Sequence, residues 1–286
     1  MSPSKPTPRV FLIANAEKSG AAESSRHLAR WLESEGMLAG VDLQGRPESV
    51  NEAKADFVIA LGGDGTILYA GQAMQDRQVP IIGVNMGKLG YLANFDVEEL
   101  RRHWAEIVAT PDLIERRLMF DVRLVSSGEE RWRGVALNDC VVRVGDPFRT
   151  VSLEIQIDDR PLCTLVGDGV ILATPTGSTA HNLSCGGPIV EPGVEAIILT
   201  PKCPHSFTYR PVLVAPSSRV CVRLLAREPG RHHAAAVLDG QRVEHFGDDC
   251  LLYVSRSSQC FQLVRNPNRT SWNTLITKLK WGQDVS

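Results

Sequence analysis

Three short apolar runs in the first part of the chain each end in a polar or glycine-rich turn. The runs cover residues 10–14, 56–61 and 80–84, and stretches with apolar residues at helical spacing separate them. The first run ends at Asn15 and the third ends at Asn85. Strands that alternate with helices favour a parallel sheet with helices on its faces. We therefore predict an α/β architecture here, with ligands bound at the carboxyl ends of the strands.

The second run ends in a turn that places three glycines around one carboxylate, Gly62, Gly63, Asp64, Gly65 and Thr66. Glycine lets the backbone approach a ligand closely, and successive N–H groups in such a turn form a concave anion site. A helix that starts here adds positive potential at the same place. Asp64 would repel an anion unless it holds a cation or orients a hydroxyl for attack. The alternative is an ordinary strand-to-helix turn in which Asp64 caps the helix.

Beyond Arg116 the sequence changes to apolar segments separated by turn signals. Strands are predicted over residues 120–125, 135–144, 153–157, 212–215, 220–225, 234–239, 250–255 and 259–264. Short strands at this spacing are typical of an antiparallel sandwich or layered β domain. We predict an α/β domain over residues 1–115 and a β-sandwich-like domain over residues 116–265. The tail, residues 266–286, is expected to contain a short helix and to pack back on the first domain.

A second polar, glycine-rich segment covers residues 168–192. It gathers small hydroxylated side chains around a proline and a glycine, namely Thr174, Thr176, Ser178 and Thr179 around Pro175 and Gly177. Such residues suit hydrogen bonds to a ribose or phosphate at close range. A strand, a Gly/Ser/Thr turn and a helix over residues 180–184 would repeat the anion-site pattern of the first motif. The alternative is a polar turn whose hydroxyl groups cap a helix.

Composition narrows the class of protein. With 31 Lys and Arg against 33 Asp and Glu, the formal net charge is -2, so no global positive field recruits nucleic acid or an anionic membrane. No apolar run reaches the roughly 18 residues that a membrane span needs, and residues 1–9 do not resemble a signal peptide. The seven cysteines are scattered without a C-x-x-C pair, which favours reduced thiols over disulfides or a zinc site. We expect a soluble, cytoplasmic protein of two domains.

The order of these motifs resembles that of the bacterial ATP-dependent NAD kinases. The resemblance rests on the turn at 62–66, the pair Asn138 and Asp139, and the stretch from 174 to 188, and it continues through 200–206 and 239–241. A similar glycine-aspartate turn occurs in diacylglycerol-type lipid kinases and phosphofructokinases, so the first motif alone is not specific. The stretch from 174 to 188 is far more specific and carries the resemblance.

The resemblance implies a Rossmann-like, phosphofructokinase-like domain at the amino end and a β domain at the carboxyl end, with NAD bound between them. It also implies transfer of the terminal phosphoryl group of ATP to the 2′-hydroxyl of the adenosine ribose of NAD. Mg²⁺ is expected through the nucleotide phosphates, with no metal cage of the protein's own. The family forms homo-oligomers, so a dimer or tetramer is expected.

The resemblance assigns the catalytic role to Asp64, which would contact the 2′-hydroxyl and accept its proton. From the resemblance together with the two motifs and the strand ends, the other residues predicted at the NAD and ATP sites are Gly62, Gly63, Gly65, Thr66, Asn85, Lys88, Asn138, Asp139, Asp168, Thr176, Ser178, Thr179, Ala180 and His181. Asn138 and Asp139 match the pair that reads the adenine end, and Lys88 lies where a basic residue often follows the third strand.

Two residues depart from the family pattern. Asp139 stands where Glu is usual, and His181 stands where Tyr is usual. Aspartate still accepts from an amino group but is one methylene shorter, and a neutral imidazole can stack or donate with a smaller area. Neither change touches Asp64, so we expect activity to survive and leave nucleotide preference open. The rival functions are a lipid or sugar kinase and a non-catalytic dinucleotide sensor.

Overall fold

The computed structural model describes residues 7–15, 21–44, 48–74, 77–87, 90–145, 150–225 and 233–280. The chain divides into two compact units, of which the first combines Met1–Arg116 with Phe261–Ser286 and the second is Arg117–Cys260. Two long strands, β5 (Ile114–Ser126) and β16 (Cys250–Val264), each begin in one unit and end in the other. The chain therefore passes from one unit to the other inside these two strands, after Arg116 and after Cys260. The sequence analysis placed the same divisions after residues 115 and 265.

The first unit contains a parallel sheet. Its strands are β1 (Val10–Ala14), β2 (Leu38–Asp42), β3 (Phe57–Leu61), β4 (Ile81–Val84) and the end of β16, in the order β2-β1-β3-β4-β16. The strand pairs are parallel, and every residue of β1 and β4 is buried. Strands buried on both faces read as continuous apolar runs. The predicted α/β architecture is confirmed.

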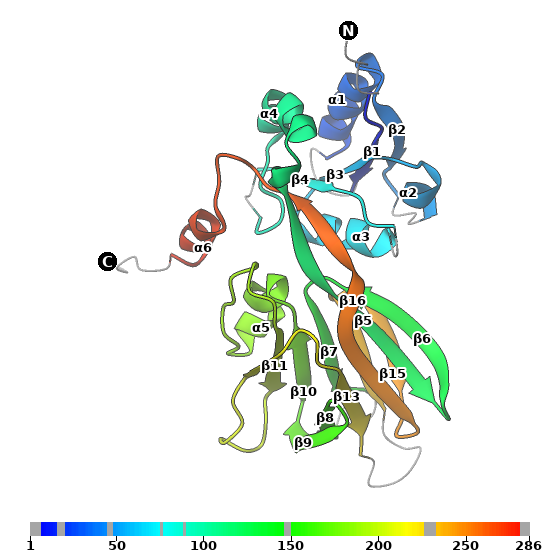
Figure 1. Ribbon diagram of the computed structural model, residues 1–286, viewed down its shortest axis with the longest axis vertical. Helices are drawn as coiled ribbons and strands as arrows, with labels where there is room; N and C mark the ends of the chain where they lie inside the picture. The colour runs from blue at the N-terminus through cyan, green and yellow to red at the C-terminus, as the bar shows by residue number, and fades with distance from the viewer. Residues whose placement is uncertain are drawn as a thin grey trace. The chain divides into compact units, whose positions relative to one another are not determined.

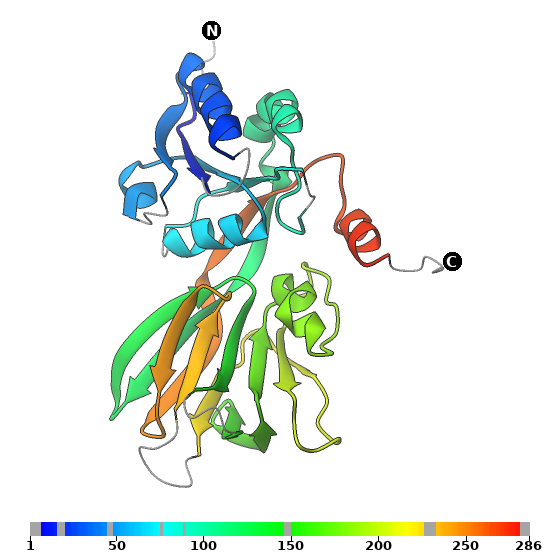
Figure 2. The same cartoon turned by 180° about the vertical axis from the view of Figure 1, so that it is seen from behind.

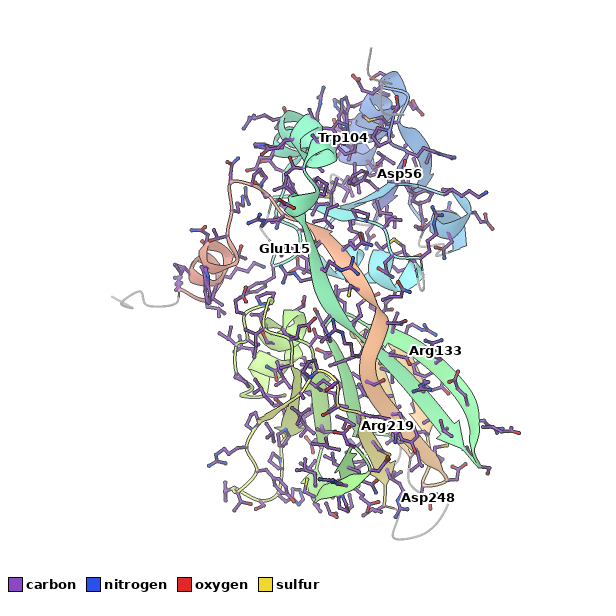
Figure 3. All side chains as sticks on the ribbon, viewed as in Figure 1. Asp56, Trp104, Glu115, Arg133, Arg219 and Asp248 are labelled. Atoms are coloured by element: carbon purple, nitrogen blue, oxygen red, sulfur yellow. The ribbon has the colours of Figure 1, made fainter. Side chains whose placement is uncertain are left out.

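Helices cover both faces of this sheet. They are α1 (Ala21–Ser34), α2 (Glu48–Glu52), α3 (Asp64–Ala73) and α4 (Val97–Ala109). In Figures 1 and 2, α1 and α4 lie on one face and α2 and α3 on the other. Trp104 of α4, labelled in Figure 3, packs edge-on against Trp31 of α1 at 5.7 Å between ring centroids. This aromatic contact ties the two helices to each other above the sheet.

The second unit is a sandwich of two antiparallel sheets. Its further strands are β6 (Glu129–Ala136), β7 (Asp139–Val144), β8 (Val151–Ile157), β9 (Arg160–Gly167), β10 (Gly169–Ala173), β11 (Ile197–Lys202), β12 (Val212–Val214), β13 (Val220–Leu224), β14 (Ala234–Leu238) and β15 (Arg242–Phe246). One sheet has the order β16-β13-β8-β9, with β5 paired to β16 and to β6. The other has the order β12-β11-β10-β7-β14-β15.

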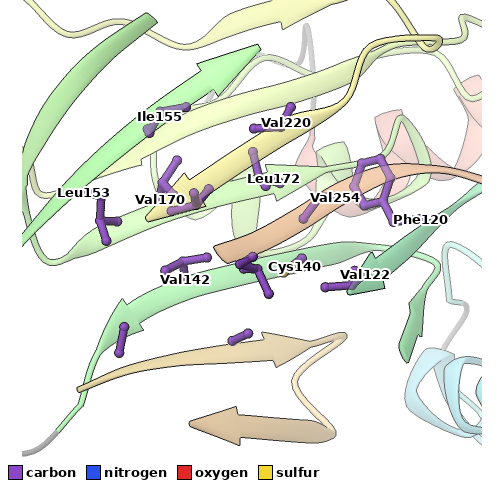
Figure 4. Close-up of a cluster of buried hydrophobic side chains, with 14 of the residues drawn as sticks. Phe120, Val122, Cys140, Val142, Leu153, Ile155, Val170, Leu172, Val220 and Val254 are labelled. Atoms are coloured by element: carbon purple, nitrogen blue, oxygen red, sulfur yellow. The ribbon is translucent and has the colours of Figure 1, made fainter. Parts of the chain in front are cut away.

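The core of this unit lies between the two sheets. Figure 4 shows buried side chains from both, including Phe120 of β5, Val142 of β7, Leu153 of β8 and Leu172 of β10. In β8, buried and partly exposed residues alternate, as the pleat of a half-buried strand requires. The predicted β-sandwich-like domain is confirmed.

Two strand predictions in this unit are wrong in detail. The single strand predicted over residues 135–144 is two strands, β6 and β7, because the chain turns at Leu137 and Asn138. The two strands predicted over residues 250–255 and 259–264 are one strand, β16. Its polar middle resembles a turn in sequence, yet Ser257 is buried within the strand.

Several helices and strands of the structure were not predicted from the sequence. Strand β2 contains a glycine and an aspartate and pairs only with β1, at the edge of the sheet. A Cβ atom at Gly40 would lie 2.7 Å from the Phe11 ring, so this glycine allows β2 to pack closely against β1. The segment is a strand because of this packing, although glycine and aspartate have low strand propensities. The short helix α2 and the strands β9 and β15 were likewise not predicted.

The tail forms the predicted helix, α6 (Ser271–Leu279), which begins with a capping box between Thr270 and Asn273. Just before it, Arg269 donates to Glu99 of α4 at 2.8 Å. Within α6, Lys278 Nζ lies 4.9 Å from the centre of the Tyr91 ring. None of the described helices is both long enough and apolar enough to cross a membrane.

Phe120 is a test of the sandwich core. It is fully buried, so we expect Phe120→Ala to lower the free energy of unfolding by about 3–5 kcal/mol through lost burial and the cavity left behind. Phe207 is 95% exposed, and the same substitution there is expected to cost no more than about 0.5 kcal/mol. Urea unfolding of both variants measures the difference, and equal costs would contradict the placement of the core.

Candidate functional site

The glycine-aspartate turn lies where β3 ends and α3 begins. Gly62 donates its N–H to the Val84 carbonyl at 2.8 Å, which ties the turn to the end of β4. Gly63 is the N-cap residue of α3, and Asp64 is its first helical residue. The turn therefore presents the amino end of a ten-residue helix at the carboxyl edge of the parallel sheet, the arrangement that favours anions.

The Asp64 carboxylate is oriented by a different segment of the chain. It accepts N–H groups from Tyr91 at 2.9 Å, Leu92 at 2.9 Å and Ala93 at 3.1 Å. A Cβ atom at Gly90 would lie 2.1 Å from its Oδ1 atom, so glycine is required for this approach. No side chain caps α3, which rules out the alternative in which Asp64 serves as its cap. Three fixed donors hold the carboxylate in one place while its residue stays partly exposed.

Asn85 closes the neighbouring turn after β4. Its Nδ2 atom donates to the Phe95 carbonyl at 2.8 Å, and its Oδ1 atom accepts from Gly87 N–H at 3.1 Å. The side chain thus shapes the start of the segment that leads to Gly90. Lys88, predicted at the same site, lies outside the described residues.

A cavity of about 380 Å³ opens on the second unit. The residues that line it are Asn138, Asp139, Val141, Arg143, Ala180, His181, Val237, Asp239, Gly240 and Val243. Four of the residues predicted at the nucleotide site meet here, namely Asn138, Asp139, Ala180 and His181. The lining combines apolar strand residues with several polar side chains, which suits a small organic ligand.

The second motif folds as a 3₁₀ turn, Thr176–Thr179, followed by a short helix, α5 (His181–Ser184). The helix predicted over residues 180–184 is thus one turn long. A Cβ atom at Gly177 would lie 2.0 Å from the Asn138 carbonyl oxygen, so glycine is required for the turn to pack on Asn138. This contact brings the second motif and the Asn138-Asp139 pair together at the cavity.

Two side chains of this motif hold the loop itself. Ser178 is fully buried, and its hydroxyl donates to the Val190 carbonyl at 3.1 Å and accepts from Val190 N–H at 3.0 Å. Asn182, also fully buried, donates to the Ser178 and Pro188 carbonyls and accepts from the Thr200 hydroxyl. The sequence analysis did not single out Asn182, although a polar residue inside a short helical stretch was a usable signal.

The remaining residues predicted in the second unit do not line the cavity. Asp168 joins β9 to β10, and its carboxylate lies 3.9 Å from the Lys202 ammonium. Thr176 and Thr179 form the two ends of the 3₁₀ turn, and Thr176 is buried.

Burial changes the acid–base chemistry of the cavity. Burial first, and the nearby Asp239 carboxylate second, raise the pKa of Asp139 to about 7. Partial burial, with Lys202 and Arg143 nearby, lowers the pKa of His181 below its ordinary value. At neutral pH the imidazole is therefore uncharged, and the Asp139 carboxyl holds its proton for a large share of the time.

Sequence comparison places both units in one family. Residues 42–112 match the family described as "ATP-NAD kinase N-terminal domain", and residues 137–266 match the family described as "ATP-NAD kinase C-terminal domain". A NAD kinase from Trichlorobacter lovleyi is 36% identical over 285 residues, which cover 96% of this chain and 99% of the relative. The chain belongs to the ATP-NAD kinase family.

Other members of the ATP-NAD kinase family support this assignment. A NAD kinase from Geobacter sulfurreducens is 36% identical over 284 residues, with 96% of this chain and 99% of that protein covered. The crystal structure of an Archaeoglobus fulgidus NAD kinase in complex with ATP matches with a TM-score of 0.74 and 26% identity, over 95% of this chain and 98% of that one. A yeast NADH kinase structure complexed with NADH shares the fold, with a TM-score of 0.85 at 24% identity over 99% of this chain and 90% of that one.

The raised pKa of Asp139 predicts a pH-dependent stability for this NAD kinase family member. The unfolded chain releases the Asp139 proton near pH 3.8, whereas the folded chain keeps it up to about pH 7. Because the folded state binds more protons between these values, this group destabilises the fold as pH rises from about 4 to about 7. The asparagine of Asp139→Asn does not titrate, so this variant does not lose stability in this way. The free energy of unfolding of the variant minus that of the wild type should therefore increase by up to about 1.4 kcal/mol per pH unit in this window.

Urea unfolding of both proteins between pH 4 and pH 9 measures this difference. Curves that stay parallel from about pH 4 to about pH 7 would contradict the shift, because the difference must grow within that window and become constant above it.

Proposed function

We propose that the protein transfers the terminal phosphoryl group of ATP to the 2′-hydroxyl of the adenosine ribose of NAD, with Asp64 as the general base. The products are NADP and ADP. The relatives from T. lovleyi and G. sulfurreducens carry the name NAD kinase, and the A. fulgidus structure holds ATP. One observation supports the assignment to Asp64. Its carboxylate lies at the amino end of α3 and is held there by the N–H groups of residues 91–93.

The role of Asp64 follows from its hydrogen bonds. In phosphoryl transfer the protein chiefly positions the reactants and stabilises charge, so the attacking hydroxyl need not be ionised beforehand. A carboxylate fixed by three backbone donors keeps a free lone pair in a constant direction. Asp64 orients the 2′-hydroxyl through that lone pair and accepts its proton late, as the new bond to phosphorus forms.

The turn around Asp64 supplies the positive potential for the phosphates. Gly62, Gly63, Gly65 and Thr66 form the turn and first residues at the amino end of α3, where the helix dipole favours anions. Asn85 shapes the adjacent turn. Lys88, two residues before Gly90, adds a positive charge to this part of the sequence.

The second unit is proposed to bind the dinucleotide. Asn138 and Asp139 offer an amide and a carboxyl group at the cavity, and Ala180 leaves space beside them. The neutral His181 imidazole can stack on an aromatic ring, as the usual tyrosine would. Thr176, Thr179 and Asp168 are proposed to meet the ribose or pyrophosphate, and Ser178 supports them by holding the loop.

Mg²⁺ is proposed to bind through the nucleotide. Within the described residues, no three His, Cys, Asp or Glu side chains gather as metal ligands would. Oxygens of the ATP phosphates are suitable ligands for this ion, which keeps several waters in nucleotide sites. When bound, the ion neutralises charge that develops on the transferred group.

We also propose that the enzyme works in the cytoplasm as a homo-oligomer, a dimer or tetramer. The seven cysteines are all free thiols, which suits a reducing compartment. Leu213 of β12 and Val243 of β15 lie exposed on the two edge strands of the six-stranded sheet. Exposed apolar side chains on sheet edges are common at subunit interfaces.

Asp64→Asn tests the general-base role. We expect kcat to fall by about two to four decades, the usual scale of general-base catalysis, while the KM for NAD stays within a few-fold of the wild type. Asp96→Asn is the matched control, because Asp96 is the N-cap of α4 and asparagine caps a helix about as well. NADP formation, followed with an NADP-specific dehydrogenase, measures both. Undiminished turnover by the Asp64 variant would overturn the assignment.

A substrate panel separates the rival functions. With Mg²⁺ and ATP, we expect ADP release with NAD and none with diacylglycerol or fructose 6-phosphate. Replacing ATP by other triphosphates or polyphosphate defines the donor range. Saturable NAD binding without ADP release would identify a dinucleotide sensor instead.

A further inference from the structure

Three successive backbone N–H groups between β6 and β7 converge on one side chain of another turn. The Asp239 carboxylate accepts from Leu137 at 2.9 Å, from Asn138 at 2.7 Å and from Asp139 at 3.1 Å. In return, Asp239 N–H donates to the Asp139 carbonyl at 3.0 Å. Asp239 is 9% exposed and adopts a positive φ of 50° in the turn between β14 and β15. The two turns are thus joined by four hydrogen bonds.

The carbonyl groups of the same segment are held from the opposite direction. Thr174 donates its N–H to the Asn138 carbonyl at 2.9 Å and its hydroxyl to the Leu137 carbonyl at 2.5 Å. That hydroxyl also accepts from Gly177 N–H at 3.1 Å. The main chain at Leu137 and Asn138 is therefore fixed on both its donor side and its acceptor side.

We propose that Asp239 is a positioning residue for nucleotide recognition: it fixes the main chain from which the Asn138 and Asp139 side chains reach the ligand. This inference rests on the dinucleotide role proposed above for that pair. Asn138 and Asp139 line the cavity directly. A displacement of their main chain by even about 1 Å would move an amide or carboxyl group out of the 2.7–3.2 Å range of a hydrogen bond.

Asp239 also sets the charge at the cavity. The Asp239 carboxylate accepts three N–H groups, and its negative charge is the second cause, after burial, of the raised pKa of Asp139. The other titratable or charged groups around Asp139 are the Cys140 and Cys185 thiols, the His181 imidazole, and the Arg143 and Lys202 cations beside that imidazole. Removing the Asp239 charge removes the second of the two causes that raise the pKa of Asp139, so a lower pKa is a signature beyond loss of packing.

Asp239→Asn is the first test. The amide oxygen of the variant can still accept the hydrogen bonds from Asn138 and Asp139 N–H. The amide NH₂ group then faces the Leu137 N–H, and because both groups are donors this hydrogen bond is lost. We expect the KM for NAD to rise about tenfold, the size of one lost hydrogen bond to a charged group, with the KM for ATP unchanged. The pH at which kcat/KM for NAD changes should also move to lower values, since this profile reports the free enzyme.

Asp158→Asn is the matched control. Asp158 also lies in a turn of the second unit and accepts from Arg219 N–H at 2.8 Å and from the Ser218 hydroxyl at 3.0 Å. The chemical change is the same, but Asp158 does not line the cavity. We expect the KM for NAD and its pH profile to match those of the wild type.

Thr174→Val is a second, independent test. It keeps the shape of a fully buried side chain and removes the hydroxyl that holds Leu137. We expect it to raise the KM for NAD without moving the pH profile, because no charge is lost. This variant decides the question if Asp239→Asn does not fold, as judged by thermal unfolding.

The outcomes separate the inference from the proposed function. A wild-type protein that forms no NADP contradicts the function. An active wild type, with a folded Asp239→Asn variant that keeps the wild-type KM for NAD and pH profile, contradicts the positioning role alone. A Thr174→Val variant with an unchanged KM for NAD also contradicts it.

Discussion

In each unit, one carboxylate collects three successive backbone N–H groups and thereby fixes a polar turn. Asp64 does so for Tyr91, Leu92 and Ala93 in the first unit, and Asp239 does so for Leu137, Asn138 and Asp139 in the second. A run of parallel N–H groups is strongly attractive to an anion, and a carboxylate of the chain satisfies it without a bound ligand. Asp64, Asn138 and Asp139, which are proposed to meet the nucleotide, depend on these two clusters for their positions.

Sequence patterns predicted the architecture well because each domain type leaves its own periodicity. Buried parallel strands such as β1 are continuous apolar runs, and β8 alternates in a way that requires one buried face. The errors arose where tertiary contacts override local signals. β2 is a strand because it pairs with β1, and the polar centre of β16 lies between the residues that pair with β13 and the residue that pairs with β4.

The candidate site was predictable in its motifs but not in its internal contacts. Glycines around Asp64 and hydroxyl groups around Gly177 are visible as patterns of small residues that suit a close ligand. No sequence pattern states which carboxylate faces which backbone amides, because Asp239 lies about a hundred positions after the residues that it holds. For Asn182, a polar residue inside a short helical stretch was visible in the sequence, but its partner Thr200 on β11 was not.

The course of β16 has a consequence for biosynthesis. Residues 261–264 belong to the first unit and complete its parallel sheet beside β4, although the whole of the second unit precedes them in the chain. During translation, the sheet of the first unit therefore keeps an unpaired edge beside β4 until the second unit has been synthesised. Vectorial synthesis thus gives the β-sandwich the opportunity to form before the older part of the chain is finished.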